Sequence, residues 1–115
     1  MVDDYAPWRR FVRSVLQKRP ELKIVGEASD GLEAVQRARE LRPDVILLDV
    51  GLPTLNGIEA ARQLHRLSPE SKILFVSQES SADVVQEALS TGACGYLVKA
   101  NASALLNAMS AVLAA

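Results

Sequence analysis

The stretch VILLDVGLPTLNG, residues 45–57, places a continuous apolar run directly before an aspartate and a turn. An apolar run of strand length is typical of a central parallel strand, because helices cover both faces of such a strand. The second half of the stretch is rich in glycine, proline, threonine and asparagine, which favour turns. We therefore predict a strand over residues 45–48, with Asp49 at its carboxyl end and a loop and a helix after it.

The same alternation of strand-like and helix-like segments extends outward from this stretch in both directions. Short apolar runs predict further strands over residues 22–27, 73–76 and 95–98, and a first strand that ends at Asp3. Amphipathic segments predict five helices: from about Pro7 to Lys18, from Asp30 to Leu41, after Gly57, up to Gly92, and over 105–113. Alternation of this kind predicts an α/β fold with a parallel sheet. We expect one domain, residues 1–115.

Several residues are assigned to the core or the surface without a chemical role. Trp8 and Phe11 lie on the apolar face of the first predicted helix, and we interpret both as core. Gly92 is expected to end a helix in the left-handed conformation. Cys94, the lone cysteine, is interpreted as a buried and inert residue, and His65 as a surface residue.

The composition limits the classes of function. The chain has 115 residues, 49% of them hydrophobic and 23% charged, and a formal net charge of −1. This charge does not supply the basic surface that gives non-specific affinity for nucleic acid, so we expect no direct nucleic-acid binding by this chain. No apolar run reaches the roughly 20 residues needed to cross a bilayer, and the start of the chain does not resemble a secretion signal. We expect a cytoplasmic protein.

Polar side chains follow the predicted strands at the points where these strands end. Asp3 and Asp4 follow the first strand, Asp49 follows the strand over 45–48, and Ser77 and Lys99 follow the next two strands along the chain. Ligands of open parallel sheets bind at the carboxyl ends of the strands. We therefore expect these side chains to share one site.

A magnesium ion suits this set of residues. Three neighbouring carboxylates repel one another unless a cation compensates their charge, and Mg²⁺ prefers oxygen ligands. We predict that Asp4 and Asp49 bind the ion directly, that the backbone carbonyl of Gly51 completes the protein's share, and that Asp3 acts through a bound water.

The chemistry predicted for Asp49 is acceptance of a phosphoryl group. With the metal and Lys99 neutralising phosphate oxygens, the carboxylate can attack phosphorus in line and form an acyl phosphate. The Ser77 hydroxyl can donate to the new group and pull its loop inward, and Tyr96 can report this change by alternating between an exposed and a buried rotamer. The residues therefore predict a signalling switch and not an enzyme.

These residues resemble the receiver domain of two-component response regulators, the CheY-like domains, over nearly the whole chain. The resemblance is carried by VDD at 2–4, LLDVGLPTLNG at 47–57, FVSQ at 75–78 and GYLVKA at 95–100. The segment GACGYLVK, 92–99, is most similar to receivers of the LuxR/NarL-type regulators, which precede a helix-turn-helix.

The resemblance implies a flavodoxin-like, doubly wound sheet of five parallel strands in the order 2-1-3-4-5, with five helices. It implies phosphotransfer to Asp49 from a sensor histidine kinase, and hydrolysis of the acyl phosphate by water at the same site. Output would pass through helix 4, strand 5 and helix 5, a surface that is also implied for homodimer formation. Control of transcription would then lie with an output domain outside this chain.

Three positions depart from the family pattern. Gln78 stands where alanine or glycine is usual, and we expect altered kinetics of phosphorylation or decay. Ala100 stands where proline is frequent, and a cis bond before a non-proline residue costs about 3 to 4 kcal/mol, so we expect either a trans bond or local strain. Only Met1 and Val2 precede Asp3, which predicts a truncated first strand, with a weakened sheet or compensation from a neighbouring chain.

Three other classes of protein remain as alternatives. A phosphohydrolase with an aspartate nucleophile would normally need a second acid two residues later, where this chain has Gly51. A nucleotide-binding enzyme is disfavoured because neither G-x-G-x-x-G nor G-x-x-x-x-G-K-[ST] occurs. A phosphorylation-silent, receiver-like protein-binding module stays open because of Gln78 and the truncated first strand.

Overall fold

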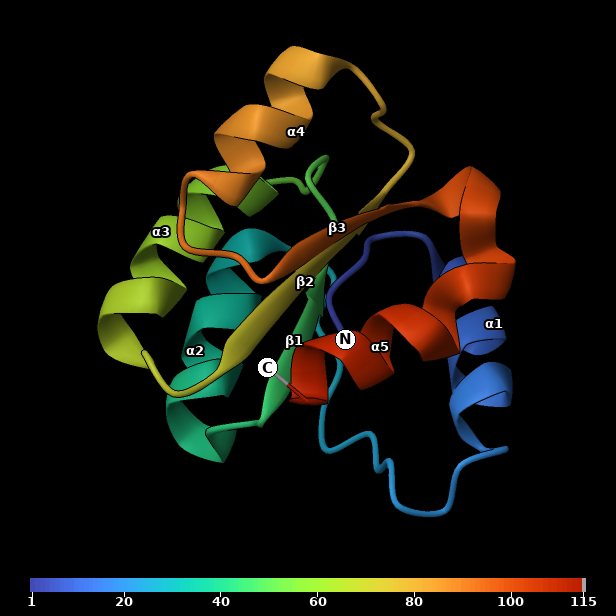
Figure 1. Ribbon diagram of the computed structural model, residues 1–115. Helices are drawn as coiled ribbons and strands as arrows, with labels where there is room; N and C mark the ends of the chain where they lie inside the picture. Colours follow the sequence, from blue (N-terminus) through green and yellow to red (C-terminus); the bar gives the residue numbers. More distant parts are fainter. Residues whose placement is uncertain (115) are drawn as a thin grey trace.

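A three-stranded parallel sheet with helices on both of its faces forms the centre of the protein, as Figure 1 shows for the computed structural model. The structure describes residues 1–114. The helices are α1 (Ala6–Leu16), α2 (Gly31–Leu41), α3 (Gly57–Leu67), α4 (Ala82–Leu89), the short 3-10 helix η1 (Lys99–Ala104) and α5 (Leu105–Ala114). The strands are β1 (Val45–Leu48), β2 (Lys72–Ser77) and β3 (Gly95–Val98). The predicted α/β class is confirmed.

The sheet brings the carboxyl ends of its strands to one edge. Its order is β1-β2-β3 and both pairs are parallel. Leu48, the last residue of β1, pairs with Phe75, two residues before the end of β2, and Ser77 pairs with Val98, the last residue of β3. The three strands therefore end within two residues of one another. Asp49 follows β1, Ser77 is the last residue of β2 and Lys99 follows β3. The edge therefore collects the three side chains on which the functional prediction depends.

The prediction of five strands is not confirmed, because the described residues contain three. The segment over residues 22–27, predicted as a strand, has no regular secondary structure, so that assignment was wrong. The predicted first strand is reduced to Val2, which forms isolated parallel bridges to Ala28 and to Leu48. Val2 thus lies between the 22–28 segment and β1, the place of the first strand in the expected order.

Backbone hydrogen bonds explain why pairing stops at Val2. The Val2 amide donates to the Leu47 carbonyl at 2.8 Å, and the Asp49 amide donates to the Val2 carbonyl at 3.1 Å. On the other side, the Asp3 amide donates to the Ala28 carbonyl at 3.0 Å. A strand needs a continuous partner, and the described chain offers residues 22–27 only Met1 beyond this bridge. Their apolar character therefore does not produce a strand.

A cavity of about 370 Å³ lies beside the start of the chain. Met1, Leu16, Ile24, Val45 and Met109 are among the residues that line it, so it separates the 22–28 segment from β1 and α5. The cavity occupies the position predicted for the rest of the first strand. The idea that the sheet is weakened there stays a prediction.

Two apolar clusters fill the space between the sheet and its helices, and they explain the continuous apolar runs of the strands. Figure 1 shows α2 and α3 on one face of the sheet and α1 and α5 on the other. Ile46 and Leu48 belong to the cluster with α2 and α3, whereas Leu47 belongs to the cluster with α1 and α5. Because successive strand residues point to opposite faces, a strand covered on both faces needs apolar residues throughout.

Local signals predicted the ends of two helices well. Asp30 Oδ1 accepts from the Glu33 amide at 2.8 Å, and Glu33 Oε1 accepts from the Ser29 amide at 3.2 Å, a capping arrangement at the start of α2. Gly92 has φ +97°, the left-handed conformation expected after α4.

The structure places no cis peptide bond within residues 1–114, so the bond before Ala100 is trans as predicted.

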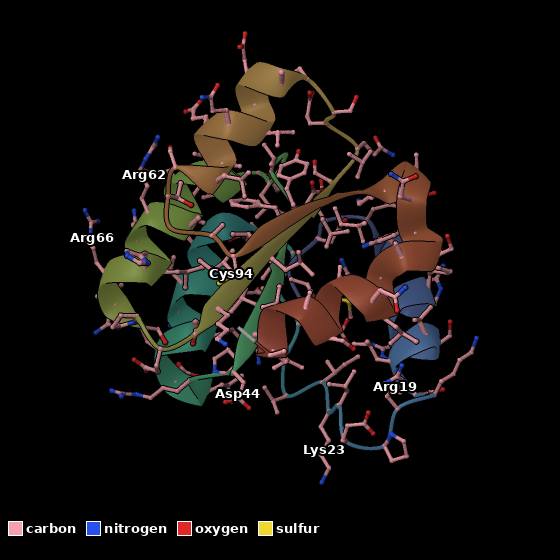
Figure 2. The ribbon with its side chains drawn as sticks, in the orientation of Figure 1. Arg19, Lys23, Asp44, Arg62, Arg66 and Cys94 are labelled. Atoms are coloured by element: carbon pink, nitrogen blue, oxygen red, sulfur yellow. The ribbon has the colours of Figure 1, made fainter. Side chains whose placement is uncertain are left out.

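Some assignments of side chains to the core were wrong. Phe11 was predicted to be core but is 40% exposed. Cys94 is exposed rather than buried, since it lies in the turn before β3 (Figure 2). His65 is exposed, as predicted. Within residues 1–114 no helix is both long enough and apolar enough to span a membrane.

Candidate functional site

Three side chains from distant parts of the sequence meet at the carboxyl edge of the sheet. Lys99 Nζ lies 2.7 Å from Asp3 Oδ2 and 3.5 Å from Asp49 Oδ2. The lysine side chain is only 11% exposed, and the two aspartates are buried. An ammonium group held between two buried carboxylates compensates part of their charge. Asp3, Asp49 and Lys99, which were predicted to share one site, therefore lie together.

Asp4 joins these aspartates in an acidic cluster, the name used here for Asp3, Asp4 and Asp49. One carboxylate oxygen of each residue lies within 4.8 Å of those of the other two. Asp4 is exposed, whereas Asp3 and Asp49 are buried. With three carboxylates and a single nearby ammonium, the cluster carries an excess of negative charge.

Burial raises the pKa of the Asp3 carboxyl, and the nearby negative charge of Asp49 adds to this increase. Lys99 and the Tyr5 amide, which donates to Asp3 Oδ1 at 2.9 Å, lower the pKa in part. Desolvation is the largest of these effects because burial penalises the ionised form. The ionised Asp3 is therefore held in an unfavourable environment that a further cation would relieve.

The hydrogen bonds of Asp3 also fit a metal ion. Among the buried side-chain nitrogen and oxygen atoms of the described residues, Asp3 Oδ2 alone has no hydrogen-bond partner, and its near neighbour is the Lys99 ammonium at 2.7 Å. A buried oxygen with an unused lone pair, two further carboxylates and their excess negative charge match the preference of Mg²⁺ for oxygen ligands. The residues present therefore fit the predicted ion.

Gly51, predicted to offer its carbonyl to the ion, lies next to the acidic cluster. Its amide donates to Asp49 Oδ1 at 3.4 Å, which fixes the start of the loop after β1 relative to the carboxylate. The residue is exposed, and a Cβ placed on it would have open space around it. The surroundings of Gly51 therefore leave room for a ligand, and its role as a ligand stays a prediction.

Ser77 and Tyr96 are linked through the loop that follows β2. Ser77 is buried, and its hydroxyl accepts from the Glu79 amide at 3.3 Å. The Tyr96 hydroxyl donates to the Glu79 carbonyl at 2.7 Å, and its ring stacks on Phe75 with centroids 5.9 Å apart. Burial raises the pKa of Tyr96, and the Ser77 hydroxyl opposes this increase. Gln78, between the two loop residues, is exposed.

Two residues of α1 that were not predicted to belong to the site lie next to it. The Trp8 ring lies under Lys99 Nζ, 5.0 Å from its centroid. The Arg9 guanidinium donates to the backbone carbonyl of Asp3 at 2.6 Å. An apolar helix face does not indicate which of its rings lies next to a charge, and Trp8 and Lys99 are far apart in the sequence. No sequence signal would have identified them.

The fold and the site together define a doubly wound α/β domain that presents an acidic cluster and a lysine at the carboxyl edge of its sheet. The sequence matches the family described as "Response regulator receiver domain" over residues 1–110. The chain belongs to this family. Receiver domains are regulatory domains, so this chain is a regulatory domain rather than an enzyme.

Relatives of the chain include transcriptional regulators and larger enzymes. It is 38% identical over 113 residues to the transcriptional regulatory protein DegU of Brevibacillus brevis, a match that covers 97% of this chain and 48% of DegU. It is 41% identical over 105 residues to a protein-glutamate methylesterase/protein-glutamine glutaminase of Thermotoga maritima, covering 90% of this chain and 30% of that protein. The chain thus spans about half or less of these curated relatives.

Solved structures show the same fold. A LuxR-family two-component response regulator from Aurantimonas sp. SI85-9A1 is 33% identical, with a TM-score of 0.93 and coverage of 98% of this chain and 81% of that chain. A response regulator from Burkholderia pseudomallei, solved with a phosphorylated aspartic acid, calcium ion and citrate, is 26% identical, with a TM-score of 0.77 and coverage of 85% and 56%. The flavodoxin-like receiver fold and the similarity to LuxR/NarL-type receivers are therefore confirmed.

Proposed function

We propose that this domain is a phosphorylation switch in which Asp49 accepts a phosphoryl group from a sensor histidine kinase. The single observation that carries this proposal is the position of Asp49, which is buried at the end of β1, within 3.5 Å of the Lys99 ammonium and beside two further carboxylates. Phosphoryl transfer depends mainly on positioning and on neutralisation of charge, and these groups supply both. The phosphorylated aspartic acid in the related Burkholderia pseudomallei structure supports the same reading.

In the proposed transfer, a carboxylate oxygen of Asp49 attacks the phosphorus of a phosphohistidine. The new P–O bond forms as the P–N bond to the donor's imidazole breaks, and the imidazole leaves with the bonding electron pair and takes up a proton. Lys99 neutralises charge on the phosphoryl oxygens, and the Ser77 hydroxyl donates to one of them. Water later attacks phosphorus, the P–O bond to Asp49 breaks with its electron pair left on the carboxylate, and inorganic phosphate and a proton are released.

Asp4 and Asp49, with the Gly51 carbonyl, would hold a Mg²⁺ ion directly, and Asp3 would act on it through water. When bound, the ion neutralises oxygens of the incoming phosphoryl group. The excess negative charge of the acidic cluster supports this assignment. The calcium ion in the related Burkholderia pseudomallei protein is consistent with a divalent cation in this family.

The proposed signal passes through Ser77 and Tyr96 to the surface formed by α4, β3 and α5. When Ser77 turns toward the phosphoryl group, its bond with the Glu79 amide breaks, and Glu79 is also the residue that accepts from the Tyr96 hydroxyl. A shift of this loop would release the Tyr96 ring to change rotamer. The altered surface would support homodimer formation and act on an output domain outside this chain that controls transcription. We place the protein in the cytoplasm, and we expect no direct nucleic-acid binding by this chain.

Intact-mass measurement tests the proposal. The chain is incubated with a small phosphodonor, with and without Mg²⁺, and Asp49→Ala is compared with Asp44→Ala, an exposed aspartate at the amino end of β1 (Figure 2). We expect one added phosphoryl group, dependent on Mg²⁺, on the wild type and on Asp44→Ala but not on Asp49→Ala. Continuous release of phosphate would indicate a hydrolase. No modification by either a small donor or a histidine kinase would indicate a phosphorylation-silent binding module.

A further inference from the structure

Trp8 packs against the apolar cluster between the sheet and α1 and α5, and its ring also contacts Lys99. The Trp8 ring lies under the ammonium at 5.0 Å, within the distance at which an aromatic face attracts a cation. Trp8 belongs to α1, whereas Lys99 follows β3, so this contact joins two elements across the site. With the side chain of Lys99 only 11% exposed, the ring also occupies space that water would otherwise fill.

The start of α1 fixes Trp8 relative to the acidic cluster. The Tyr5 amide donates to Asp3 Oδ1 at 2.9 Å, and the Trp8 amide donates to the Tyr5 carbonyl at 3.0 Å. The Arg9 side chain donates to the Asp3 carbonyl at 2.6 Å. The first turn of α1 is therefore bonded to Asp3 on both sides of Trp8. An indole on such an anchored turn has a defined position under Lys99.

Lys99 lies between two carboxylates that both attract it. Its ammonium is closer to Asp3, at 2.7 Å, than to the acceptor Asp49, at 3.5 Å. A phosphoryl group on Asp49 would add negative charge there and draw the ammonium away from Asp3. An aromatic face has no localised charge that would have to be released in such a move, yet it attracts a cation over a range of positions. The ring can therefore support the ammonium in both places.

We propose that Trp8 is a positioning residue for the phosphoryl-transfer reaction, which holds the Lys99 ammonium beside Asp49 through a cation–π contact. This inference rests on the proposed function, since it assigns Lys99 to that reaction. The contact between Trp8 and Lys99 can be measured separately, whether or not phosphate is transferred.

Rates of phosphorylation by a small phosphodonor test the role of Trp8. Trp8→Leu keeps an apolar side chain but removes the aromatic face, and we expect uptake roughly three- to tenfold slower than in the wild type, the range that a partly desolvated cation–π contact would give. Trp8→Phe keeps a weaker aromatic face and should fall between the two. Phe11→Leu is the matched control, because it removes a neighbouring ring of α1, 5.1 Å from Trp8, and should stay within twofold of the wild type.

Equal rates for Trp8→Leu and the wild type would overturn the proposal. Equal slowing by Trp8→Leu and Phe11→Leu would also overturn it, because the effect would then come from packing on α1. Urea unfolding of each variant identifies any loss of folding, and rates are compared only between variants that are folded.

An NMR measurement separates failure of this inference from failure of the proposed function. A ring under Lys99 should shift the resonances of the lysine's terminal CH₂ group upfield, and this shift should be lost in Trp8→Leu and kept in Phe11→Leu. If the wild type takes up no phosphate but shows the shift, the proposed function fails and the positioning contact stands. If the wild type shows no upfield shift, the positioning role is wrong even where phosphate is transferred.

Discussion

Replacing Asp3 with asparagine removes a buried negative charge from the acidic cluster while keeping the size of the side chain. The asparagine oxygen can still accept from the Tyr5 amide, as Asp3 Oδ1 does at 2.9 Å. Lys99 still has Asp49 as an ionic partner, at 3.5 Å. The substitution therefore leaves one buried anion facing one buried cation, and we expect it to stabilise the metal-free protein.

The distances give the size of the effect. At an effective dielectric constant of about 20, charges 2.7 Å apart, as for Lys99 and Asp3, attract by about 6 kcal/mol, and charges 4.8 Å apart repel by about 3.5 kcal/mol. The repulsion between Asp3 and its two carboxylate neighbours, Asp4 and Asp49, therefore offsets the attraction between Asp3 and Lys99. Desolvation then decides the balance, and it disfavours the ionised Asp3. We expect Asp3→Asn to raise the free energy of unfolding by about 1 to 2 kcal/mol.

Urea unfolding without Mg²⁺ is the assay, with Asp44→Asn, an exposed aspartate, as the control. A gain of this size should raise the urea midpoint by about 1 M, whereas Asp44→Asn should leave it near the wild-type value. Added Mg²⁺ should stabilise the wild type and Asp44→Asn, because a ligand that binds only the folded state stabilises it. It should stabilise Asp3→Asn less, because this variant lacks the carboxylate proposed to act on the ion through water. A lower midpoint for Asp3→Asn without Mg²⁺ would refute this account of the acidic cluster.

The pH dependence of stability gives an independent check that the ionised Asp3 destabilises the metal-free protein. The pKa of Asp3 is raised in the folded state, so the folded protein binds this proton more tightly than the unfolded chain does. The ionised Asp3 therefore destabilises the folded protein above the pKa that Asp3 has in the folded state. This destabilisation is relieved as the pH falls from that pKa toward the lower pKa of the unfolded chain. Wild-type stability without Mg²⁺ should gain from this group as the pH is lowered from 7, and Asp3→Asn should lack that contribution.

Three further predictions follow from other parts of the molecule. Gln78→Ala should change the rate of phosphorylation or of acyl phosphate decay, because the exposed glutamine follows Ser77; unchanged rates in a phosphate-release assay would contradict this. Four apolar residues added before Met1 should raise the melting temperature by filling the cavity of about 370 Å³, at roughly 1.5 to 3 kcal/mol per buried aliphatic side chain; no increase in a calorimetric scan would count against a weakened sheet. Gly92→Ala should cost about 1 kcal/mol or more in a urea titration, because φ is +97° there and a Cβ would lie 2.8 Å from the His65 ring; an unchanged midpoint would show that the turn adapts.

The sequence was sufficient to predict those strands whose partners it also contains. Residues 45–48 and 95–98 form strands at the predicted positions, because both runs are apolar and pair with β2. Residues 22–27 have a similar apolar character but form no strand, because a strand depends on its neighbour as well as on its own residues. A pattern read along the chain does not contain that information.

The candidate site was predictable to the extent that topology determines it. Ligands bind at the carboxyl ends of parallel strands, and this rule predicted that Asp3, Asp49 and Lys99 share one site although they are distant in sequence. The rule could not identify Trp8, because its place on an apolar helix face is compatible with simple burial. It also could not indicate that Lys99 lies nearer to Asp3 than to Asp49, because such a preference depends on ångström-scale geometry.

The site also keeps its geometry although the first strand is almost absent. Val2 is bonded on one side to Leu47 and Asp49, and Asp3 is bonded to Ala28 on the other side. These bonds set the backbone of Asp3 and that of Asp49 at the same height in the sheet, whatever lies beside residues 22–27. A weakness of the sheet near the cavity would therefore lower the stability of the whole domain before it changed the distances within the acidic cluster. For this reason, added residues before Met1 should raise the melting temperature while leaving the Mg²⁺ dependence of phosphorylation unchanged.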